Sequence, residues 1–247
     1  MTLNEFSEQF DVLYNSVTSN QAPGLSEYEK SFFLTKSQKE TIKNHYTASS
    51  GGNNLKLGFD DSAKRQADFS LLMKVGKCEK ANVNNQIDPR SIVFKLPSDL
   101  FIVVNESVIA SGIIKQVVPI RFDEYTTYMM KPFKRPFKNQ VWRLINSGSS
   151  GDSVTRYAEL IFSPEVTGRD PLEYNVRYIK TPYPIIVGDL EGQTIDGQEY
   201  KSDAVLDTDP ILHDEILQRA VEIAKLSWTQ LGQDNTQSII ASGQRSE

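Results

Sequence analysis

The strongest constraint on the fold is a pair of helix-start signals inside one stretch, residues 25–46. Ser26 is followed three residues later by Glu29, a spacing that lets each side chain satisfy a free backbone N–H at the start of a helix. Thr35 and Gln38 repeat the same spacing. The stretch therefore predicts two helices, one that begins after Ser26 and another that begins after Thr35.

The first of these helices is predicted over residues 27–33 and the second ends near residue 46, with a break between them. Tyr28 and Phe32 stand four residues apart and so share one helical face, which Phe33 widens. The simple interpretation is a pair of amphipathic helices that bury these rings in an ordinary core. The alternative is that the three aromatic residues contact another subunit or a partner.

Helical patterns also stand at both ends of the chain. Residues 3–17 place five apolar side chains at alternating spacings of three and four, which puts them on one stripe: Leu3, Phe6, Phe10, Leu13 and Val17. Asp209 and Pro210 start a last helix that runs to about residue 231 and ends at Gly232. Its small and aromatic residues are further candidates for a close contact with another chain: Ala220, Ala224 and Trp228.

The middle of the chain changes to β character after Pro89. Runs rich in Val, Ile and Phe, separated by short polar turns, predict strands at residues 91–96, 100–105, 108–120, 141–146, 156–162 and 174–180. Asn105 and Glu106 form a plausible hairpin tip, and the Gly/Ser-rich residues 147–153 predict a mobile one. The predicted fold class is α+β, with helices from both chain ends packed around a mostly antiparallel β-sheet or small barrel.

This pattern divides the chain into five regions. We expect a helical unit, a loop-rich connection, a β-rich core, a terminal helix and a mobile tail, at residues 1–47, 48–88, 89–208, 209–232 and 233–247.

Residues 131–138, with the sequence KPFKRPFK, interleave four basic residues with Phe133 and Phe137. Pro132 ends a short helix that Asp123 would cap, and Pro136 would help to keep the following chain extended. We call residues 131–138 the arm. The arm can be interpreted as a stiff segment that presents aromatic anchors to a protein partner, as a plain structural loop, or as a nucleic-acid contact.

The sequence offers no recognisable catalytic, cofactor or metal site. His45 and His213 have no partners at metal-ligand spacing, and Cys78 is the lone cysteine. Phosphate-binding loops and nucleophile elbows are absent from the sequence. An acidic group at the start of the last helix lacks the glycine that bends a calcium loop, so it predicts a solvated helix start: Asp207, Asp209, Asp214 and Glu215.

Charge and hydropathy bound the remaining function classes. A net charge of −5 argues against a protein that wraps nucleic acid, although it is compatible with a channel through which a duplex slides. No apolar run approaches the roughly 20 residues that span a bilayer. We therefore expect a soluble protein, made in the cytoplasm, with no membrane contact.

Three stretches of the chain carry a resemblance to a known family: residues 27–38 (EYEKSFFLTKSQ), residues 125–142 around the arm, and residues 178–187 (YIKTPYPIIV) followed by the terminal helix LHDEILQRAVEIAKLSW. They resemble segments of neck proteins in the virions of crAss-like tailed bacteriophages. The resemblance implies a head–tail connector protein that forms a homo-oligomeric ring, dodecameric in the family, below the portal. It further implies contacts with the portal and other tail or ring proteins, a place in the neck of the virion, and passage of duplex DNA through the lumen without sequence-specific binding.

Two other classes stay open at this point. A tail-tube or capsid-associated structural protein would share the virion but have other neighbours. A soluble hydrolase that uses two carboxylates would need them to face each other across a cleft, a geometry that sequence alone does not reveal.

Overall fold

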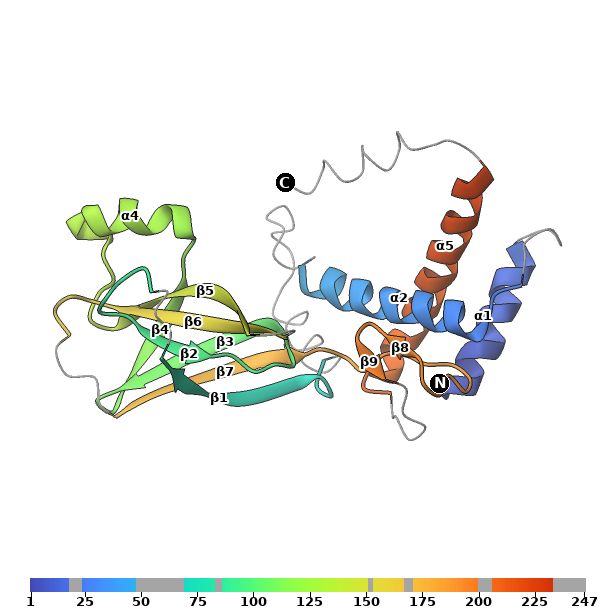
Figure 1. Ribbon diagram of the computed structural model, residues 1–247, viewed down its shortest axis with the longest axis horizontal. Helices are drawn as coiled ribbons and strands as arrows, with labels where there is room; N and C mark the ends of the chain where they lie inside the picture. Colours follow the sequence, from blue (N-terminus) through green and yellow to red (C-terminus); the bar gives the residue numbers. More distant parts are fainter. Residues whose placement is uncertain are drawn as a thin grey trace. The chain divides into compact units, whose positions relative to one another are not determined.

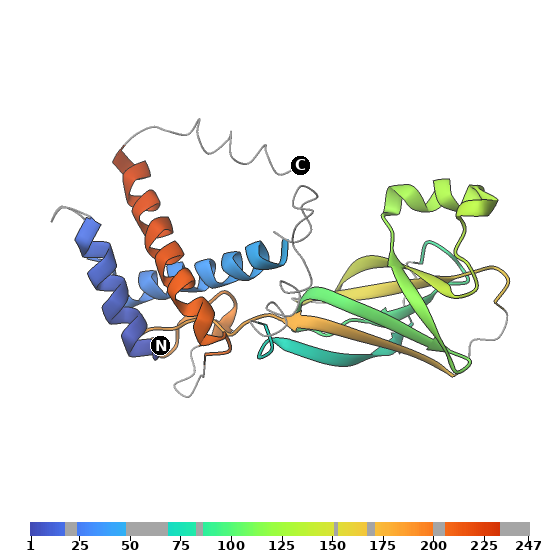
Figure 2. The same ribbon diagram turned by 180° about the vertical axis from the view of Figure 1, so that it is seen from behind.

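The computed structural model describes residues 1–17, 24–47, 69–82, 86–150, 153–166, 171–199 and 206–232 (Figure 1, and from behind in Figure 2). The chain divides into two compact units. Met1–Leu71 and Pro182–Glu247 together form one, which we call the helical unit, and Leu72–Thr181 form the other, the barrel unit. The two ends of the chain thus meet in one unit, and the middle folds as the other. The predicted α+β class, with helices from both ends and a small barrel, is confirmed.

The helical unit is built from α1 (Leu3–Val17), α2 (Glu27–Thr47), η2 (Pro210–Leu212), α5 (His213–Gly232) and the short hairpin of β8 (Thr194–Ile195) and β9 (Gln198–Glu199). Helix α5 packs against both α2 and α1. Fully buried apolar side chains from all three helices form its core: Phe6, Phe10, Leu34, Ile42, Ile216 and Ala220.

Helix α1 buries a stripe slightly rotated from the predicted one. Phe6 and Phe10 are buried as expected, but Tyr14 completes the stripe in place of Leu13, which reaches the surface. The buried residues Phe6, Phe10 and Tyr14 are thus spaced by four and lie on one face of α1. The side chain of Val17 lies outside the described part of the chain.

Helix α2 corrects the predicted pair of helices, because it runs from Glu27 to Thr47 without a break. Thr35 does not cap a second helix: its hydroxyl lies 3.5 Å from the carbonyl oxygen of Ile185 and donates to it. Ser37 likewise donates to the carbonyl of Ile216, at 2.6 Å. Thr35 therefore does not start a helix, and it lies with Ser37 among the buried polar residues of α2 that bond to distant backbone.

Most residues from Pro182 to Val187 are buried, in a segment that is neither helix nor strand. Val187 donates its N–H to the Ser31 hydroxyl, at 2.8 Å. This segment was expected in the β-rich core at residues 89–208, but the structure places it in the helical unit, against α2.

The barrel unit is a closed barrel of seven strands in the order β1-β2-β6-β5-β4-β3-β7. Their bounds are β1 Met73–Ala81, β2 Ile92–Lys95, β3 Leu100–Ala110, β4 Ile113–Pro119, β5 Gln140–Ser150, β6 Ser153–Phe162 and β7 Leu172–Lys180. All neighbouring pairs are antiparallel except β4 and β5. Apolar side chains cluster in its core, among them Phe94, Val108, Val141, Leu160 and Val176.

Three strand predictions differ from the structure. Strand β1 lies within residues 48–88, which were expected to be a loop-rich connection. Strand β3 continues through Asn105 and Glu106, and the hairpin turns instead at Ser111 and Gly112, whose φ angles of 53° and 77° fit a tight turn. Ladder pairing between β5 and β6 reaches Ser150 and Ser153, so the expected tip at residues 147–153 is mostly strand. Gly151 and Asp152 lie outside the described residues.

Asn105 and Glu106, predicted to form a hairpin tip, lie within strand β3. The β3–β7 register shifts between Val103 and Asn105, which marks a β-bulge. Glu106 then lies half-buried with its carboxylate beside Arg143 and Tyr174. A break in an apolar run thus indicated a bulge and an ion pair within one strand.

The parallel pair β4–β5 requires a crossover, because parallel strands cannot be joined by a hairpin. Helix α4 (Phe122–Met130) and the 3-10 turn η1 (Pro132–Lys134) form this crossover, and Figure 1 shows α4 beside the strands near β5. Helix α4 starts at Phe122, and Arg121 instead of the predicted Asp123 occupies the capping position. The crossover carries the arm and so sets the position of the candidate surface.

Candidate partner-contact surface

Helix α4 is held on the barrel by an aromatic cluster on the outer side of β5 and β6. Trp142, Leu144 and Ile161 are buried there. The rings of Tyr128 and Trp142 meet edge to face, with centroids 6.1 Å apart and planes inclined by 61°. The packing makes α4 part of the barrel unit and fixes where the arm begins.

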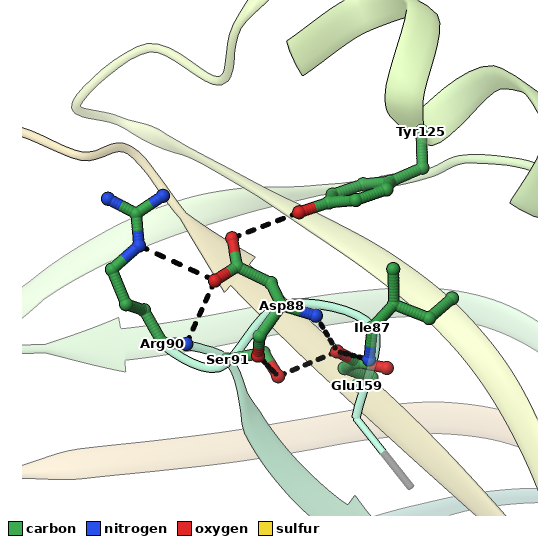
Figure 3. A network of polar contacts seen from close by, with 6 residues as sticks. All are labelled: Ile87, Asp88, Arg90, Ser91, Tyr125 and Glu159. Carbon is green, nitrogen blue, oxygen red and sulfur yellow. Dashed lines mark hydrogen bonds and ion pairs between the residues drawn. The ribbon is translucent and has the colours of Figure 1, made fainter.

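A polar network fastens the same helix through Tyr125 (Figure 3). The Tyr125 hydroxyl of α4 donates to Asp88 Oδ2 at 3.2 Å, and the Arg90 backbone N–H donates to Asp88 Oδ1 at 2.8 Å. Burial opposes ionisation of Asp88, but these hydrogen bonds outweigh it and hold the pKa of the carboxyl below its ordinary value. Burial and the neighbouring Asp88 raise the pKa of Tyr125 to about 12, so the phenol stays protonated.

The centre of the network is Glu159 of β6, which has no exposed surface. Its Oε1 accepts hydrogen bonds from the N–H groups of Ile87 and Asp88, at 2.9 and 3.1 Å, and from the Ser91 hydroxyl, at 2.6 Å. Its Oε2 accepts from the Asn146 amide at 3.0 Å. Four donors therefore satisfy a buried carboxylate and pin residues 87–91 to the barrel wall.

The arm is compact, which corrects the expectation of a stiff extended segment. Its backbone turns in η1, where the Lys134 N–H donates to the Lys131 carbonyl at 3.0 Å. Arg135 Nε donates to the Met129 carbonyl at 2.8 Å, the Lys115 ammonium donates to the Lys138 carbonyl, and Pro136 is buried. Proline at the first position of a helical turn is favoured, so Pro132 starts this turn instead of extending the chain.

Anchoring the arm leaves its aromatic side chains outside. Phe133 is 94% exposed and Phe137 is 66% exposed, while Pro132 is also at the surface. Phe122 and Met130, at the two ends of α4, are exposed as well. An open groove of about 530 Å³ lies beside the arm and is lined by Pro132, Arg135, Pro136, Phe137, Pro164 and Glu165, among others. Large apolar side chains gathered on one element are typical of a protein-contact surface.

The other predicted contact residues lie in the helical unit. Tyr28 and Phe32 of α2 are exposed, and the half-buried Phe33 meets the Phe32 ring edge to face at 5.7 Å. Ala220 and Ala224 are buried inside the unit, so the close helix approach that they allow occurs within one chain. The Trp228 side chain lies outside the described residues. The structure therefore presents Tyr28 and Phe32 on the surface, but not the two alanines.

Both histidines lie against other residues of the helical unit. His213 is buried beside the Phe6 ring, its Nε2 lies 3.1 Å from the Thr208 carbonyl oxygen, and its burial lowers the pKa of the ring. His45 Nε2 lies 2.6 Å from a carboxylate oxygen of Glu215. Among the described residues, no group of three or more His, Cys, Asp and Glu side chains could hold a metal ion. Asp209 caps the start of η2 by accepting from the Ile211 N–H at 3.0 Å, as the predicted helix start requires.

The ion pair within the barrel unit was not foreseen from the sequence. Arg143 Nε of β5 lies 3.2 Å from Glu106 Oε1, and the Tyr174 hydroxyl donates to Glu106 Oε2 at 2.9 Å. Burial raises the pKa of the Glu106 carboxyl, although Arg143 and Tyr174 oppose the shift. Burial also raises the pKa of the Cys78 thiol to about 12, which keeps it an unreactive thiol at neutral pH. The only local signal was a charged residue inside an apolar strand.

No helix in the described ranges is long and apolar enough to cross a membrane. Exposed aromatic rings lie on α2, at the start of α4 and on the arm, and such rings suit contacts with another protein.

Comparison with known proteins identifies the kind of chain that carries this surface. A model of the family described as phage tail ring protein 3/4 matches residues 1–236. Ring protein 4/5 of Bacteroides phage crAss001 is 46% identical over 253 residues, which cover 100% of this chain and 100% of the relative. Ring protein 3 of the same phage is 32% identical over 243 residues, 94% of this chain and 98% of the relative. The chain therefore belongs to the phage tail ring protein 3/4 family, the structural ring proteins of crAss-like phages.

Proposed function

We propose that this chain assembles into a closed homo-oligomeric ring in the head–tail connector of a virion, below the portal, and that the ring forms part of the conduit for genome DNA. Family membership across residues 1–236 is the observation that carries the proposal. The two relatives are named ring proteins, which favours a ring over a tail-tube or capsid-associated protein and over a carboxylate-dependent hydrolase. A dodecamer is the stoichiometry to test first.

The proposed neighbours are the portal and other tail or ring proteins, with the chain made in the host cytoplasm and then built into the neck. We propose no catalytic role and no cofactor. The overall net charge of −5 is compatible with passage of duplex DNA without tight binding.

The arm is the proposed subunit contact. Phe133 is almost fully exposed although η1 and Pro136 fix the backbone beneath it. An anchored backbone loses less conformational entropy on docking, and a buried aromatic anchor contributes about 2 kcal/mol or more to an interface. The basic residues of the arm should contribute mainly to the rate and salt dependence of encounter.

The test compares two double variants of the full chain. Phe133→Ala with Phe137→Ala should abolish assembly into rings while the subunit stays folded, because the exposed rings contribute little to the fold. Lys134→Gln with Arg135→Gln should assemble normally. Light scattering measures assembly, and circular dichroism during heating measures folding.

The reverse result would overturn the proposed role of the arm. If the Phe variant forms rings while the Gln variant loses binding to duplex DNA, the arm is a nucleic-acid contact. If the wild-type chain forms no oligomer alone or with the other neck proteins, the ring proposal itself fails.

A further inference from the structure

The two units carry opposite charge. The helical unit has 21 acidic and 11 basic residues, a net charge of −10, whereas the barrel unit has 11 acidic and 16 basic residues, a net charge of +5. The overall value of −5 hides this division. Opposite charges on two parts of one chain favour contact between unlike parts of neighbouring copies.

The contrast is sharpest between two elements. The arm has four basic residues and no acidic one, while α1 has three acidic residues and no basic one. On α1, Glu5, Glu8 and Val12 follow one another at spacings of three and four and therefore share a face. All three are exposed, Val12 by 67%. We call this face the α1 stripe.

Each of these surfaces combines exposed apolar side chains with charged ones. Phe133 and Phe137 stand among the lysines of the arm, and Val12 stands beside the carboxylates of the α1 stripe. The opposite face of α1 is already occupied, since Phe6, Phe10 and Tyr14 are buried in the helical unit. The α1 stripe is thus available to a second copy of the chain.

We infer that in the ring the arm of one subunit docks on the α1 stripe of the next subunit. This inference rests on the proposed ring. A two-fold contact of arm with arm would bring like charges together, and so would a contact of α1 with α1. A head-to-tail contact instead pairs unlike surfaces, and repeated head-to-tail contacts form a ring when the rotation between subunits closes.

The inference agrees with the expectation that Lys134→Gln with Arg135→Gln assembles normally. Neutralising exposed charges removes only a weak attraction, because exposed ion pairs contribute about 0 to 1 kcal/mol each. Reversing the charges does more, since it adds repulsion against a like-charged neighbour. Reversal therefore tests the partner surface, whereas neutralisation does not.

The experiment uses two full-length charge-reversal variants. The arm variant carries Lys131→Glu, Lys134→Glu and Lys138→Glu. The helix variant carries Glu5→Gln, Glu8→Lys and Gln9→Lys. In the wild type, the Glu5 carboxylate accepts a hydrogen bond from the Thr2 N–H at 2.7 Å, and Glu5→Gln keeps an oxygen for that bond. Light scattering and analytical ultracentrifugation measure assembly at low salt, and thermal unfolding of each variant checks that it is folded.

Each variant alone should lose at least about tenfold in assembly affinity, because its arm and α1 stripe now carry the same sign. An equimolar mixture should recover assemblies of wild-type size, since each arm then meets a stripe of opposite sign. About 1 M salt, where the Debye length is about 3 Å, should reduce the difference between the mixture and the separate variants. Carbodiimide cross-linking of wild-type rings made from isotope-labelled and unlabelled copies should join Lys131 or Lys134 to Glu8 in mixed pairs.

Three results would overturn the inference. The first is that either variant forms rings alone. The second is that the mixture stays unassembled although both variants are folded. The third is that the arm in wild-type rings cross-links to residues outside α1. In each case wild-type rings would still support the proposed function. A wild-type chain that never self-associates would instead count against the ring itself, so the two failures are distinguishable.

Discussion

At the scale of single residues, buried carboxylates organise the barrel unit more than its surface charges do. Glu159 accepts four hydrogen bonds from two separate segments, residues 87–91 and strand β5. Asp88 links that centre to α4 through Tyr125. Such groups stabilise a fold only while their partners remain, because an unpaired buried polar group costs free energy.

Glu159→Ala should lower the free energy of unfolding by about 3 kcal/mol, since it removes the acceptor of two backbone N–H groups and of the Asn146 amide. Glu165→Ala is the matched control: its side chain is exposed and pairs with Lys138, so its loss should cost under about 1 kcal/mol. Urea unfolding followed by tryptophan fluorescence measures both. Equal effects would show that the network does not stabilise the barrel.

Asp88 should make the stability of the barrel sensitive to acid. Because its pKa is lower in the folded chain, the ionised form favours folding, and this contribution is present above the ordinary pKa of about 4 and lost as pH falls through the lowered value. Asp88→Asn should therefore be less stable than wild type at neutral pH and should show a smaller loss on acidification. Unfolding free energies compared between neutral and acid pH test this expectation; parallel pH curves for the two chains would contradict it.

At the scale of elements, α2 shows how one local pattern can have two outcomes. Ser26 and Glu29 form the predicted capping box, with N–H to side-chain distances of 2.8 and 3.3 Å. Thr35 and Gln38 have the same spacing but lie inside the helix and are buried. The difference comes from the segment around Ile185, whose backbone accepts the Thr35 hydroxyl.

Glycine substitutions separate a cap from a helix interior. Ser26→Gly should cost only a few tenths of a kcal/mol, because glycine is tolerated at the capping position. Thr35→Gly should cost about 1 kcal/mol or more, because glycine is unfavourable inside a helix and a buried hydrogen bond is lost. Thermal unfolding of the full chain measures the two changes. A smaller effect at Thr35 than at Ser26 would restore the interpretation as two helices.

At the scale of the whole molecule, the barrel unit is a continuous segment inserted between the two parts of the helical unit. Its first and last strands pair with each other, from Met73 opposite Ile179 to Cys78 opposite Tyr174. The Lys180 N–H also donates to the Leu72 carbonyl at 2.9 Å. The barrel can therefore be excised without opening a strand ladder.

Residues 72–181 expressed alone should fold, with dispersed amide resonances and a cooperative thermal transition. Residues 1–47 alone should not, because α2 packs against α5 from the other end of the chain and most helical stability in proteins comes from such tertiary packing. Nuclear magnetic resonance spectra of the two fragments provide the comparison. A disordered barrel fragment would show that closure depends on the helical unit.

The sequence by itself determined the features that depend on neighbours along the chain. The helical ends, the Ser26 cap, the Asp209 cap and most strands follow from periodicity and local hydrogen bonding. The arm was likewise identified from its composition, because interleaved Phe, Pro and Lys residues are unusual in a core.

Only the tertiary structure decided what distant segments do to one another. It joined the two halves of α2, carried β3 past Glu106 to meet Arg143, buried Ala220 and Ala224 within the chain, and fastened the arm to Lys115. In each case a polar or small residue has several local roles of similar free energy. The partner that packs against it selects one, and that partner lies far away in the sequence.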